Sequence, residues 1–292
     1  MKETLALILT LVLLPVFFLM FDYQKTENTG QAVLLGKTFA CGENKYCGEK
    51  IEITCADCTE EHAPLLQTIG EYQESVAECL SDYFDFEPSK IRYFASNPQN
   101  FSCSKDTCLV TGIAFNGAVK FNGFPAYMGK GEKTHAQNIV ADVHETTHAF
   151  AFYALGTPIP QWFDEGLAIQ TDARVNCHPR QFEEKRMSEE KLGPILVELK
   201  NGKKMSEVIE QPTEHDRGAV FFYALEKEFS CGKECVARLF RQLQALRLEK
   251  IAQGKGFSTS SPFLTNEIIK EETEKITGKD ASWLFEYLEI RR

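Results

Sequence analysis

Positive charge is scarce in this 292-residue sequence. The chain has 32 lysines and arginines against 42 aspartates and glutamates, which gives a formal net charge of −10. A nucleic-acid-binding surface needs clustered lysine and arginine to neutralise phosphates, so the composition argues against nucleic acid as a partner. Internal repeats and low-complexity tracts are also missing. The 43% hydrophobic content predicts one large domain or two modest ones with a sizeable core.

Charge is absent as well from Thr4 to Phe21, within the N-terminal run "MKETLALILTLVLLPVFFLMF". This run is long for the apolar core of a signal peptide and short for a full membrane span. No small-residue cleavage site follows it directly, and no cysteine closes it as in a lipoprotein signal. We expect residues 1–21 to form a membrane anchor, with a cleaved signal as the alternative, and residues 22–40 to form a polar stalk. The remainder would face the extracytoplasmic side, or be secreted if the signal is cleaved.

Cysteine, in contrast, is plentiful, with ten residues in the chain. An even number behind an N-terminal apolar segment predicts disulfide bonds in an oxidising compartment. The close pairs are Cys41 and Cys47, Cys55 and Cys58, Cys103 and Cys108, and Cys231 and Cys235, which leaves Cys79 and Cys177. A rival interpretation makes the four cysteines of the Cys-rich segment 41–60 a four-thiolate zinc site. The pairing itself cannot be read from the sequence.

Apolar periodicity predicts strands in the first half of the chain and helices in the second. Helical spacing covers residues 63–84, and strands are expected in "KIEITC", "KIRYFAS", "CLVTGIAF" and "AVKFNG", the last two joined by a tight turn. A capping box of Thr134 and Gln137 predicts a helix over about 135–155, which Gly156 ends, and the next helix starts near Gln161. This order predicts an α+β fold with a strand-rich N-terminal lobe and a helical C-terminal lobe.

Histidine is rare, with six residues in the chain, yet two of them lie one helical turn apart in "HETTH". Residues four apart share one face of a helix, so the imidazoles of His144 and His148 can bind one metal ion. Glu145 lies about 100° around the helix and can act on a metal-bound water without ligating the metal. A catalytic zinc also needs a third protein ligand and an open position.

The segment "PQWFDEGLAIQ" supplies a candidate third ligand, Glu165. An antiparallel pair of helices joined by a short loop would bring its carboxylate to the two histidines. Trp162 and Leu167 are expected to pack this second helix against the first. Asp164 is a candidate second-shell residue that hydrogen-bonds a ligand imidazole; an exposed position at the helix start is the alternative.

"HETTH" followed by "WFDEGLA" resembles the gluzincin metallopeptidases, which include thermolysin and the aminopeptidases related to leukotriene A4 hydrolase. The resemblance implies a thermolysin-like zincin fold, with the active site on paired helices between the lobes of a catalytic domain over residues 61–292. It also implies one Zn²⁺ per chain held by His144, His148 and Glu165, with Glu145 as the general base. The gap between the motifs is slightly shorter than in the best-known members, which predicts a tight loop.

The segment "HDRGAVFFYALEKEF" is similar to the Y-x-K-G-A segment of the aminopeptidase branch, in which the tyrosine hydrogen-bonds the tetrahedral intermediate. His215 stands in the position of this tyrosine, so the resemblance implies a catalytic role for it in stabilising the oxyanion. Tyr223 is a rival donor, and a surface position without a role is the alternative for His215. No role is expected for His62, His135 or His178.

The G-x-M-E-N segment that binds the free amine of a substrate in that branch is missing. The nearest stretch, "GFPAYMGKG", has no acidic residue, so an endopeptidase is slightly favoured over an aminopeptidase. The strand "AVKFNG" could pair with an extended peptide in the cleft or be one strand of the core sheet. The sequence thus predicts a zinc metallopeptidase in which Glu145 activates a zinc-bound water to hydrolyse a peptide bond.

Two other functions remain open at this point. The fold could bind zinc, have lost peptidase activity, and serve as a membrane-tethered, extracytoplasmic interaction module. Alternatively, the metal site could be accidental and the chain a disulfide-bonded extracellular interaction domain. Metal analysis of the purified protein separates the second alternative from both zinc-binding interpretations, and a peptidase assay separates the first.

Overall fold

A computed structural model describes most of the chain after its N-terminal segment. The described residues all belong to one compact unit, residues 38–292. They are residues 44–55, 60, 63–96, 103–104, 107–108, 112–115, 118–122, 131–175, 177, 189–229, 231–232, 234–258 and 260–290.

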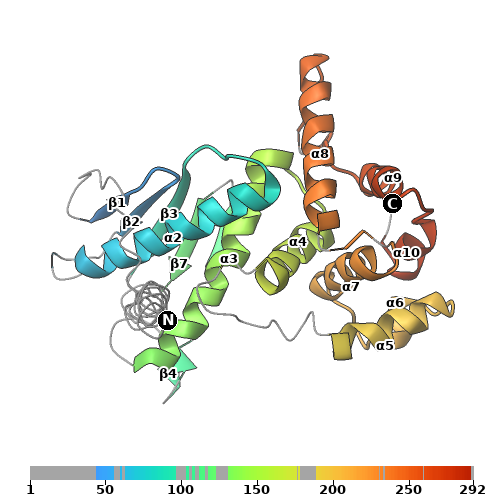
Figure 1. Cartoon of the computed structure of the whole chain (residues 1–292), viewed down its shortest axis with the longest axis horizontal. Helices are drawn as coiled ribbons and strands as arrows, with labels where there is room; N and C mark the ends of the chain where they lie inside the picture. Colours follow the sequence, from blue (N-terminus) through green and yellow to red (C-terminus); the bar gives the residue numbers. More distant parts are fainter. Residues whose placement is uncertain are drawn as a thin grey trace, which may run out of the picture. The chain divides into compact units, whose positions relative to one another are not determined.

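A mixed five-stranded sheet forms the first half of the described chain, with strand order β1-β2-β3-β7-β6 (Figure 1). The two central pairings, β2 with β3 and β3 with β7, are parallel, whereas both edge pairings are antiparallel. The strands are β1 (Lys45–Cys47), β2 (Ile51–Cys55), β3 (Ile91–Ser96), β6 (Gly112–Phe115) and β7 (Ala118–Asn122); β4 (Cys103–Ser104) and β5 (Thr107–Cys108) form a separate two-stranded ladder.

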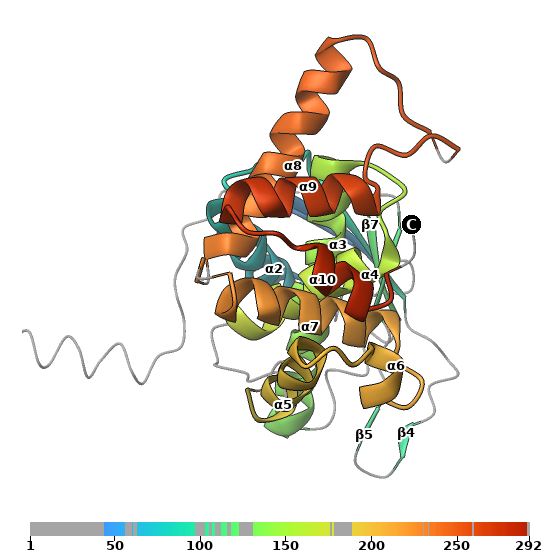
Figure 2. The same ribbon diagram turned by 90° about the vertical axis from the view of Figure 1, so that its right-hand side faces the viewer.

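Helices make up the second half of the described chain. They are stacked in the order α9, α10, α7, and then α5 with α6 (Figures 1 and 2). The end of α8 stands out from the others. The helices are α2 (Ala63–Phe84), α3 (Gly131–Leu155), α4 (Gln161–Arg174), α5 (Glu189–Lys200), α6 (Met205–Val208), α7 (Glu214–Lys227), α8 (Glu234–Ala252), α9 (Asn266–Thr277) and α10 (Ser282–Tyr287). Strands followed by helices confirm the predicted α+β class, while the two-lobed zincin arrangement stays a prediction.

Alternating burial explains why β2 forms a strand of this sheet. Ile51, Ile53 and Cys55 are at most 1% exposed, and the two residues between them are half-buried. The crossover helix α2 between the parallel strands β2 and β3 presents Val76 and Leu80, both fully buried, to the core. Period-2 and helical burial patterns in consecutive segments are what a strand–helix–strand unit requires.

Stacked aromatic rings join the sheet half of the molecule to the helical half. Phe84 at the end of α2 stacks on Phe240 of α8 with ring centroids 4.1 Å apart, and Phe150 of α3 lies 6.1 Å from Phe84. All three side chains are fully buried. Large aromatic side chains contribute much of the free energy of burial, so α3 is held at the centre of one continuous core.

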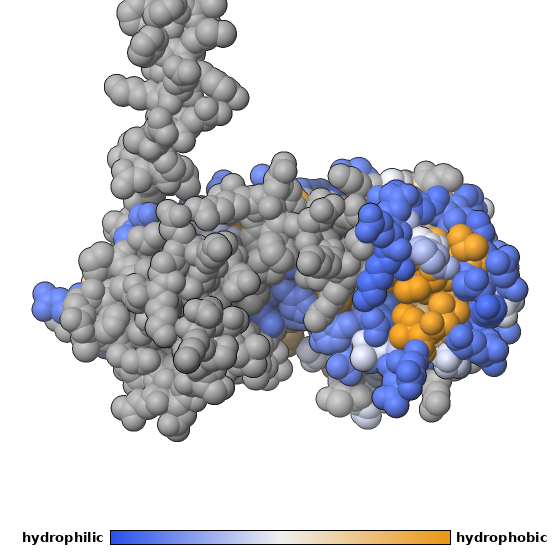
Figure 3. Space-filling view, turned by 90° about the horizontal axis from the view of Figure 1, so that it is seen from below, coloured by the Kyte–Doolittle hydropathy of each residue, from blue (hydrophilic) through white to orange (hydrophobic). Residues whose placement is uncertain are grey.

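The described residues on the face shown in Figure 3 are mostly hydrophilic. Figure 3 shows one apolar patch at the helical end of the molecule, surrounded by hydrophilic residues. Few large apolar side chains are exposed among the described residues; they are Phe94, Val197, Leu248 and Ile251. The hydrophobic content is therefore used mainly in the core.

The expected membrane anchor needs correction. Residues 1–21 and the stalk at 22–40 lie outside the described residues. In the part of the chain that the structure describes, no helix has the length and apolar character needed to cross a bilayer. The predicted membrane segment is therefore corrected: the described part of the chain gives it no support, and neither an anchor nor a membrane partner enters the proposals below.

The cysteines form disulfide bonds, as the composition predicted. Cys79 of α2 is bonded to Cys177 beyond α4, and Cys231 is bonded to Cys235 at the start of α8. Cys47 and Cys55 are also disulfide-bonded, and the described residues include no free thiol. The alternative of a four-thiolate zinc site in residues 41–60 is therefore wrong, because disulfide sulfurs are not thiolate ligands.

The structure also decides two local points, the start of α3 and the role of β7. The helix α3 begins at Gly131 rather than near residue 135, so Thr134 lies inside it and cannot cap it; Glu132 and Lys133, both good helix formers, extend it. The strand β7 pairs on both sides, with β3 and β6, and is thus part of the core sheet. Its alternative role as an edge for an extended peptide is excluded because its backbone groups are already used.

The Cys79–Cys177 bridge should contribute more stability than the Cys231–Cys235 bridge. The first joins residues 98 positions apart and the second joins residues four apart. Loop-closure entropy gives about 4.7 kcal/mol for a loop of roughly 100 residues and about 2 kcal/mol for one of about five. We expect the double variant C79S/C177S to lose about twice as much free energy of unfolding in urea as the matched variant C231S/C235S. Equal losses would contradict this estimate.

Candidate metal centre

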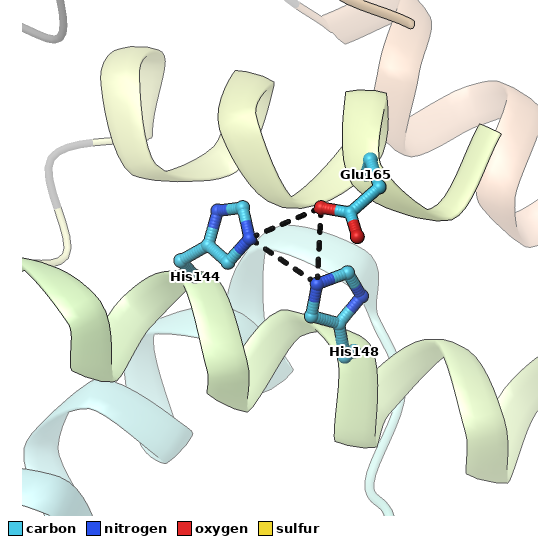
Figure 4. Close-up of side chains that lie close together, drawn as sticks. All are labelled: His144, His148 and Glu165. Carbon is cyan, nitrogen blue, oxygen red and sulfur yellow. Dashed lines mark hydrogen bonds and ion pairs between the residues drawn. The ribbon is translucent and has the colours of Figure 1, made fainter. Parts of the chain in front are cut away.

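Three side chains from two helices converge on one point (Figure 4). His144 and His148 point from successive turns of α3, and Glu165 points back at them from α4, just after its first turn. The Nε2 atoms of the two histidines are 3.2 Å apart. Glu165 Oε2 lies 3.4 Å from His144 Nε2 and 3.7 Å from His148 Nε2. These three residues could hold one metal ion.

The spacing of the three ligand atoms fits a zinc ion. Zinc binds imidazole nitrogen and carboxylate oxygen at about 2.0–2.2 Å in tetrahedral geometry, so neighbouring ligand atoms are about 3.3 Å apart. The observed separations of 3.2, 3.4 and 3.7 Å bracket this value. Glu165 Oε2 is buried, and the imidazole nitrogens around it are at ion-pair distance but not in hydrogen-bonding geometry. A cation at this point would satisfy that oxygen.

The helix α3 is fixed by its contacts with the sheet. The hydroxyl groups of Tyr93 on β3 and Thr146 on α3 share a buried hydrogen bond of 2.7 Å. Thr147 donates a hydrogen bond of 2.8 Å to the carbonyl of Val143. The two threonines of "HETTH" are fully buried, so the opposite face of the helix carries the two histidines toward α4.

A tight connection turns the chain from α3 into α4. Gly156 has φ +76°, a left-handed conformation that glycine adopts without strain, and its N–H donates to the carbonyl of Phe152. The helix α4 begins at Gln161, and the carbonyl of Pro160 accepts hydrogen bonds from the N–H groups of Phe163 and Asp164. The loop is as short as expected, and it puts the first turn of α4 beside His148.

Asp164 lies on the outer side of His148. Its Oδ2 is 3.0 Å from His148 Nδ1, the ring nitrogen that faces away from the other ligands. A carboxylate in this place favours the tautomer with the proton on Nδ1 and leaves the Nε2 lone pair for a metal. Asp164 is also in the first turn of α4, where the helix dipole stabilises negative charge.

His215 reaches the same centre from a third helix, α7. Its Nε2 lies 2.9 Å from Glu165 Oε2. The imidazole is parallel to that of His144, with ring centroids 6.5 Å apart. His215 is not one of the residues whose ligand atoms lie within 4.8 Å of one another, so it borders the metal position without completing a fourth protein ligand.

Two glycines allow α7 to approach α4 this closely. A side-chain carbon added at Gly166 would lie 2.5 Å from the Cα of Gly218, and one added at Gly218 would lie 2.1 Å from the carbonyl oxygen of Trp162. Real side chains never come so near a backbone. This contact was not predicted from the sequence. A glycine inside each of two helices that also carry site residues could have indicated a close approach of the helices.

The helix α4 packs differently from the sequence prediction in one respect. Trp162 is buried against α7 and α10, with its ring 4.9 Å from that of Phe221 and 5.7 Å from that of Phe285, rather than against α3. Its Nε1 donates a hydrogen bond of 2.9 Å to Asn266. Trp162 therefore fixes the start of α4 against α7 and α10.

Neighbouring charges lower the pKa of Glu165 and raise the pKa of His148. Burial raises the pKa of Glu165, but the imidazoles of His144, His148 and His215 outweigh it and lower this pKa below its usual value. Burial lowers the pKa of His148, but Asp164 above all, with Glu165 and Glu145, raises it to about 9. Without a metal, His148 is therefore protonated at neutral pH.

Exposure increases across the site toward α7. The side chain of His148 is 10% exposed, those of Glu165 and His144 are 18% and 19%, and that of His215 is 38%. His215 is therefore the most exposed side chain of the centre. Three protein ligands would leave a zinc ion one position for solvent, which is the arrangement that a catalytic zinc requires.

The other candidate residues lie as follows. Glu145 is half-buried next to His144 and contributes to the raised pKa of His148. Tyr223 is 3% exposed, and its hydroxyl would lie 3.6 Å from a side chain at Gly193 of α5, so it points away from the metal position. The sites of His62, His178 and the side chain of His135 lie outside the described residues.

Comparisons with known proteins add little to this geometry. No protein-family model matches the sequence, and no curated protein matches it. Among solved structures, the chain is similar to an aminopeptidase N family protein from Idiomarina loihiensis, with 11% identity and a TM-score of 0.43. The similarity covers 78% of this chain and 46% of that one, so the chain spans less than half of that protein's length. We base no functional conclusion on it.

Replacing Gly218 with alanine should separate α7 from α4. The added carbon would meet the Trp162 carbonyl oxygen at 2.1 Å, and overpacking against backbone costs about 1–3 kcal/mol or more. We expect a lower melting temperature and weaker zinc binding in G218A. The control is G256A, where an added carbon meets nothing within 4 Å. Unchanged stability in G218A would show that the helices do not depend on this contact.

Zinc affinity should rise with pH up to about 9. Because the pKa of His148 is raised to about 9, zinc must displace its proton below that pH, and the apparent affinity should fall about tenfold per pH unit on acidification. Competition with a chromophoric chelator between pH 6.5 and 9.5 measures this slope. In D164N the affinity should stop rising at a lower pH, because this variant lacks the carboxylate that contributes most to the raised pKa of His148. A flat profile between pH 7 and 9 would contradict the assignment.

Proposed function

We propose that this protein is a gluzincin-type, zinc-dependent peptidase. His144, His148 and Glu165 hold one zinc ion per chain, and the catalytic domain covers residues 61–292 with a thermolysin-like arrangement. The observation that carries the proposal is the convergence of two imidazole nitrogens and one carboxylate oxygen within 3.2–3.7 Å. The resemblance of "HETTH" and "WFDEGLA" to the gluzincin motifs supports it independently.

Zinc, when bound, polarises a carbonyl group and lowers the pKa of water to about 7 in well-studied sites. Glu145 is the general base in this proposal: its carboxylate accepts a proton from the attacking water and then gives it to the leaving amine. Its place next to His144 and its influence on the pKa of His148 support this role. A half-buried carboxylate is close enough to the ligands and remains accessible to water.

His215 stabilises the negative charge that develops on the carbonyl oxygen. An Nε2–H donor at the exposed side of the centre suits this task, because donors aimed at developing charge stabilise the transition state. The distance of 2.9 Å to Glu165 supports the assignment over Tyr223, which is buried toward α5. Asp164 is a positioning residue in this proposal, since it orients His148 through Nδ1.

The proposed substrate is a peptide in extended conformation. The strand β6 is the outermost described strand of the sheet on the side next to α3, with which it is in contact. A peptide that adds to this edge by backbone hydrogen bonds would run beside the metal ligands. Such binding needs no free amino terminus, which favours endopeptidase over aminopeptidase activity.

We also propose that the protein works in an oxidising, extracytoplasmic compartment. Disulfide bonds persist in such compartments and are rare where thiols are kept reduced. The Cys79–Cys177 and Cys231–Cys235 bonds support this location.

Changing Glu145 to Gln should abolish peptide hydrolysis while zinc remains bound. Glutamine keeps the size of the side chain but cannot accept the proton, and loss of a general base lowers kcat by about 10²–10⁴-fold. Hydrolysis of a fluorogenic peptide library and zinc content per chain are the two measurements. The matched control is E267Q, an exposed position at the start of α9.

The two measurements together separate the possible functions. Retained hydrolysis in E145Q would overturn the role of Glu145. A wild-type protein that binds one zinc and cleaves no member of the library would be the zinc-binding interaction module. A wild-type protein without zinc after reconstitution would contradict both functions.

A further inference from the structure

A cavity separate from the metal centre lies where α3 ends and the chain turns toward α4. Its volume is about 310 Å³, within the range of about 300–1,000 Å³ that is typical of small-molecule sites. Its walls come from the end of α3, from α8 and from the segment that follows α8. None of the metal ligands, nor Glu145 or His215, lines it, so it is distinct from the metal centre.

The one charged side chain in this cavity is Arg247 of α8. Its Nη1 donates hydrogen bonds of 3.3 and 3.1 Å to the carbonyls of Tyr153 and Ala154, which anchors the guanidinium at the end of α3. Its Nε and Nη2 would lie 2.9 Å from a side-chain carbon at Gly156, a residue that also lines the cavity. Because Gly156 has no side chain, none extends from this position over that edge of the guanidinium.

Nothing in the described part of the chain neutralises this cation. No carboxylate forms an ion pair with Arg247 there, and neither Nε nor Nη2 has a hydrogen-bond acceptor among those residues. The chain as a whole carries a net charge of −10, so carboxylates are abundant elsewhere. Burial lowers the pKa of Arg247, yet a guanidinium stays protonated in proteins. The cavity thus holds a fixed, half-buried positive charge with two unused donors.

Aromatic rings form the rest of the wall. Phe152 and Tyr153 contact each other edge to face at 5.4 Å at the end of α3. Phe257 and Phe263 do the same at 5.3 Å on the segment after α8. Two backbone hydrogen bonds of 3.0 Å between Ser258 and Ser261 hold that segment in a tight turn, so its two rings are fixed on one side.

We propose that this cavity binds a carboxylate that carries an aromatic group. The Nε and Nη2 edge of a guanidinium matches the two oxygens of a carboxylate, and paired, charge-assisted hydrogen bonds of this kind are strong. The aromatic walls receive the apolar part of the ligand. Two sources have this chemistry: a free aromatic carboxylic acid, and the C-terminal carboxylate of a peptide that ends in an aromatic residue.

Binding of matched ligands to the full-length protein tests the proposal. The probes are phenylacetate, the tripeptide acetyl-Ala-Ala-Phe with a free carboxylate, and the same tripeptide as its amide. Ligands of this size bind with a Kd of about 1 mM or below when most atoms make contacts. Isothermal titration calorimetry should show binding of at least one acid and at least tenfold weaker binding of the amide. The tighter of the two acids identifies the source, and either result supports the site.

Two variants test whether the acid binds in this cavity. R247K keeps the charge but removes the two-donor edge, and T157F places a bulky ring on an exposed residue of the cavity wall; each should weaken binding at least tenfold. The control is R241K, the same replacement on α8 at a residue that bonds to Tyr83 outside the cavity. Melting temperatures show whether each variant is folded, and T157F leaves the Arg247 contacts with α3 in place.

The proposal is overturned if acid and amide bind equally, if neither acid binds, or if R247K and T157F both bind the acid as tightly as the unaltered protein. The last outcome would show that the acid binds outside this cavity. Phenylacetate has no peptide bond, so its binding does not depend on whether the protein hydrolyses peptides.

Discussion

The metal centre depends on how closely the first turn of α4 approaches its two neighbours. Three consecutive residues at the end of this turn and the start of the next make the contacts: Asp164 contacts His148, Glu165 meets both histidines of α3, and Gly166 lies against Gly218 of α7. The short connection through Gly156 sets the distance to α3, and the paired glycines set the distance to α7. Any side chain at either glycine would move His215 away from Glu165, since a backbone cannot give way as a side chain can.

The shifted pKa values in the centre result from the short distances between its carboxylates and imidazoles. Carboxylates and imidazoles that are mostly buried would each be costly alone, but here they lie within 4 Å of one another and offset each other's burial. The raised pKa of His148 means that a proton occupies the centre when no metal does. A divalent cation replaces that positive charge and satisfies the buried oxygen of Glu165, which is how a preformed site couples metal binding to protonation.

Much of the site could be predicted from the sequence because its parts are local. The four-residue spacing of the histidines, the stop at Gly156 and the carboxylate at the start of the next helix follow from helix geometry. The contact between Gly166 and Gly218, the direction of Trp162 and the inner position of β7 could not be predicted, because they depend on which distant segments pack together. The N-terminal apolar run suggested a membrane anchor from composition alone, and no described helix supports a span.

The central claim is that two imidazoles and one carboxylate surround a single zinc ion. X-ray absorption at the zinc edge of the reconstituted protein tests it most directly, because the spectrum reports ligand type and distance. The account predicts a shell of nitrogen and oxygen at about 2.0–2.2 Å, with the scattering pattern of two imidazoles and no sulfur. A shell of sulfur at about 2.3 Å, a single imidazole, or a protein that retains no zinc would contradict it.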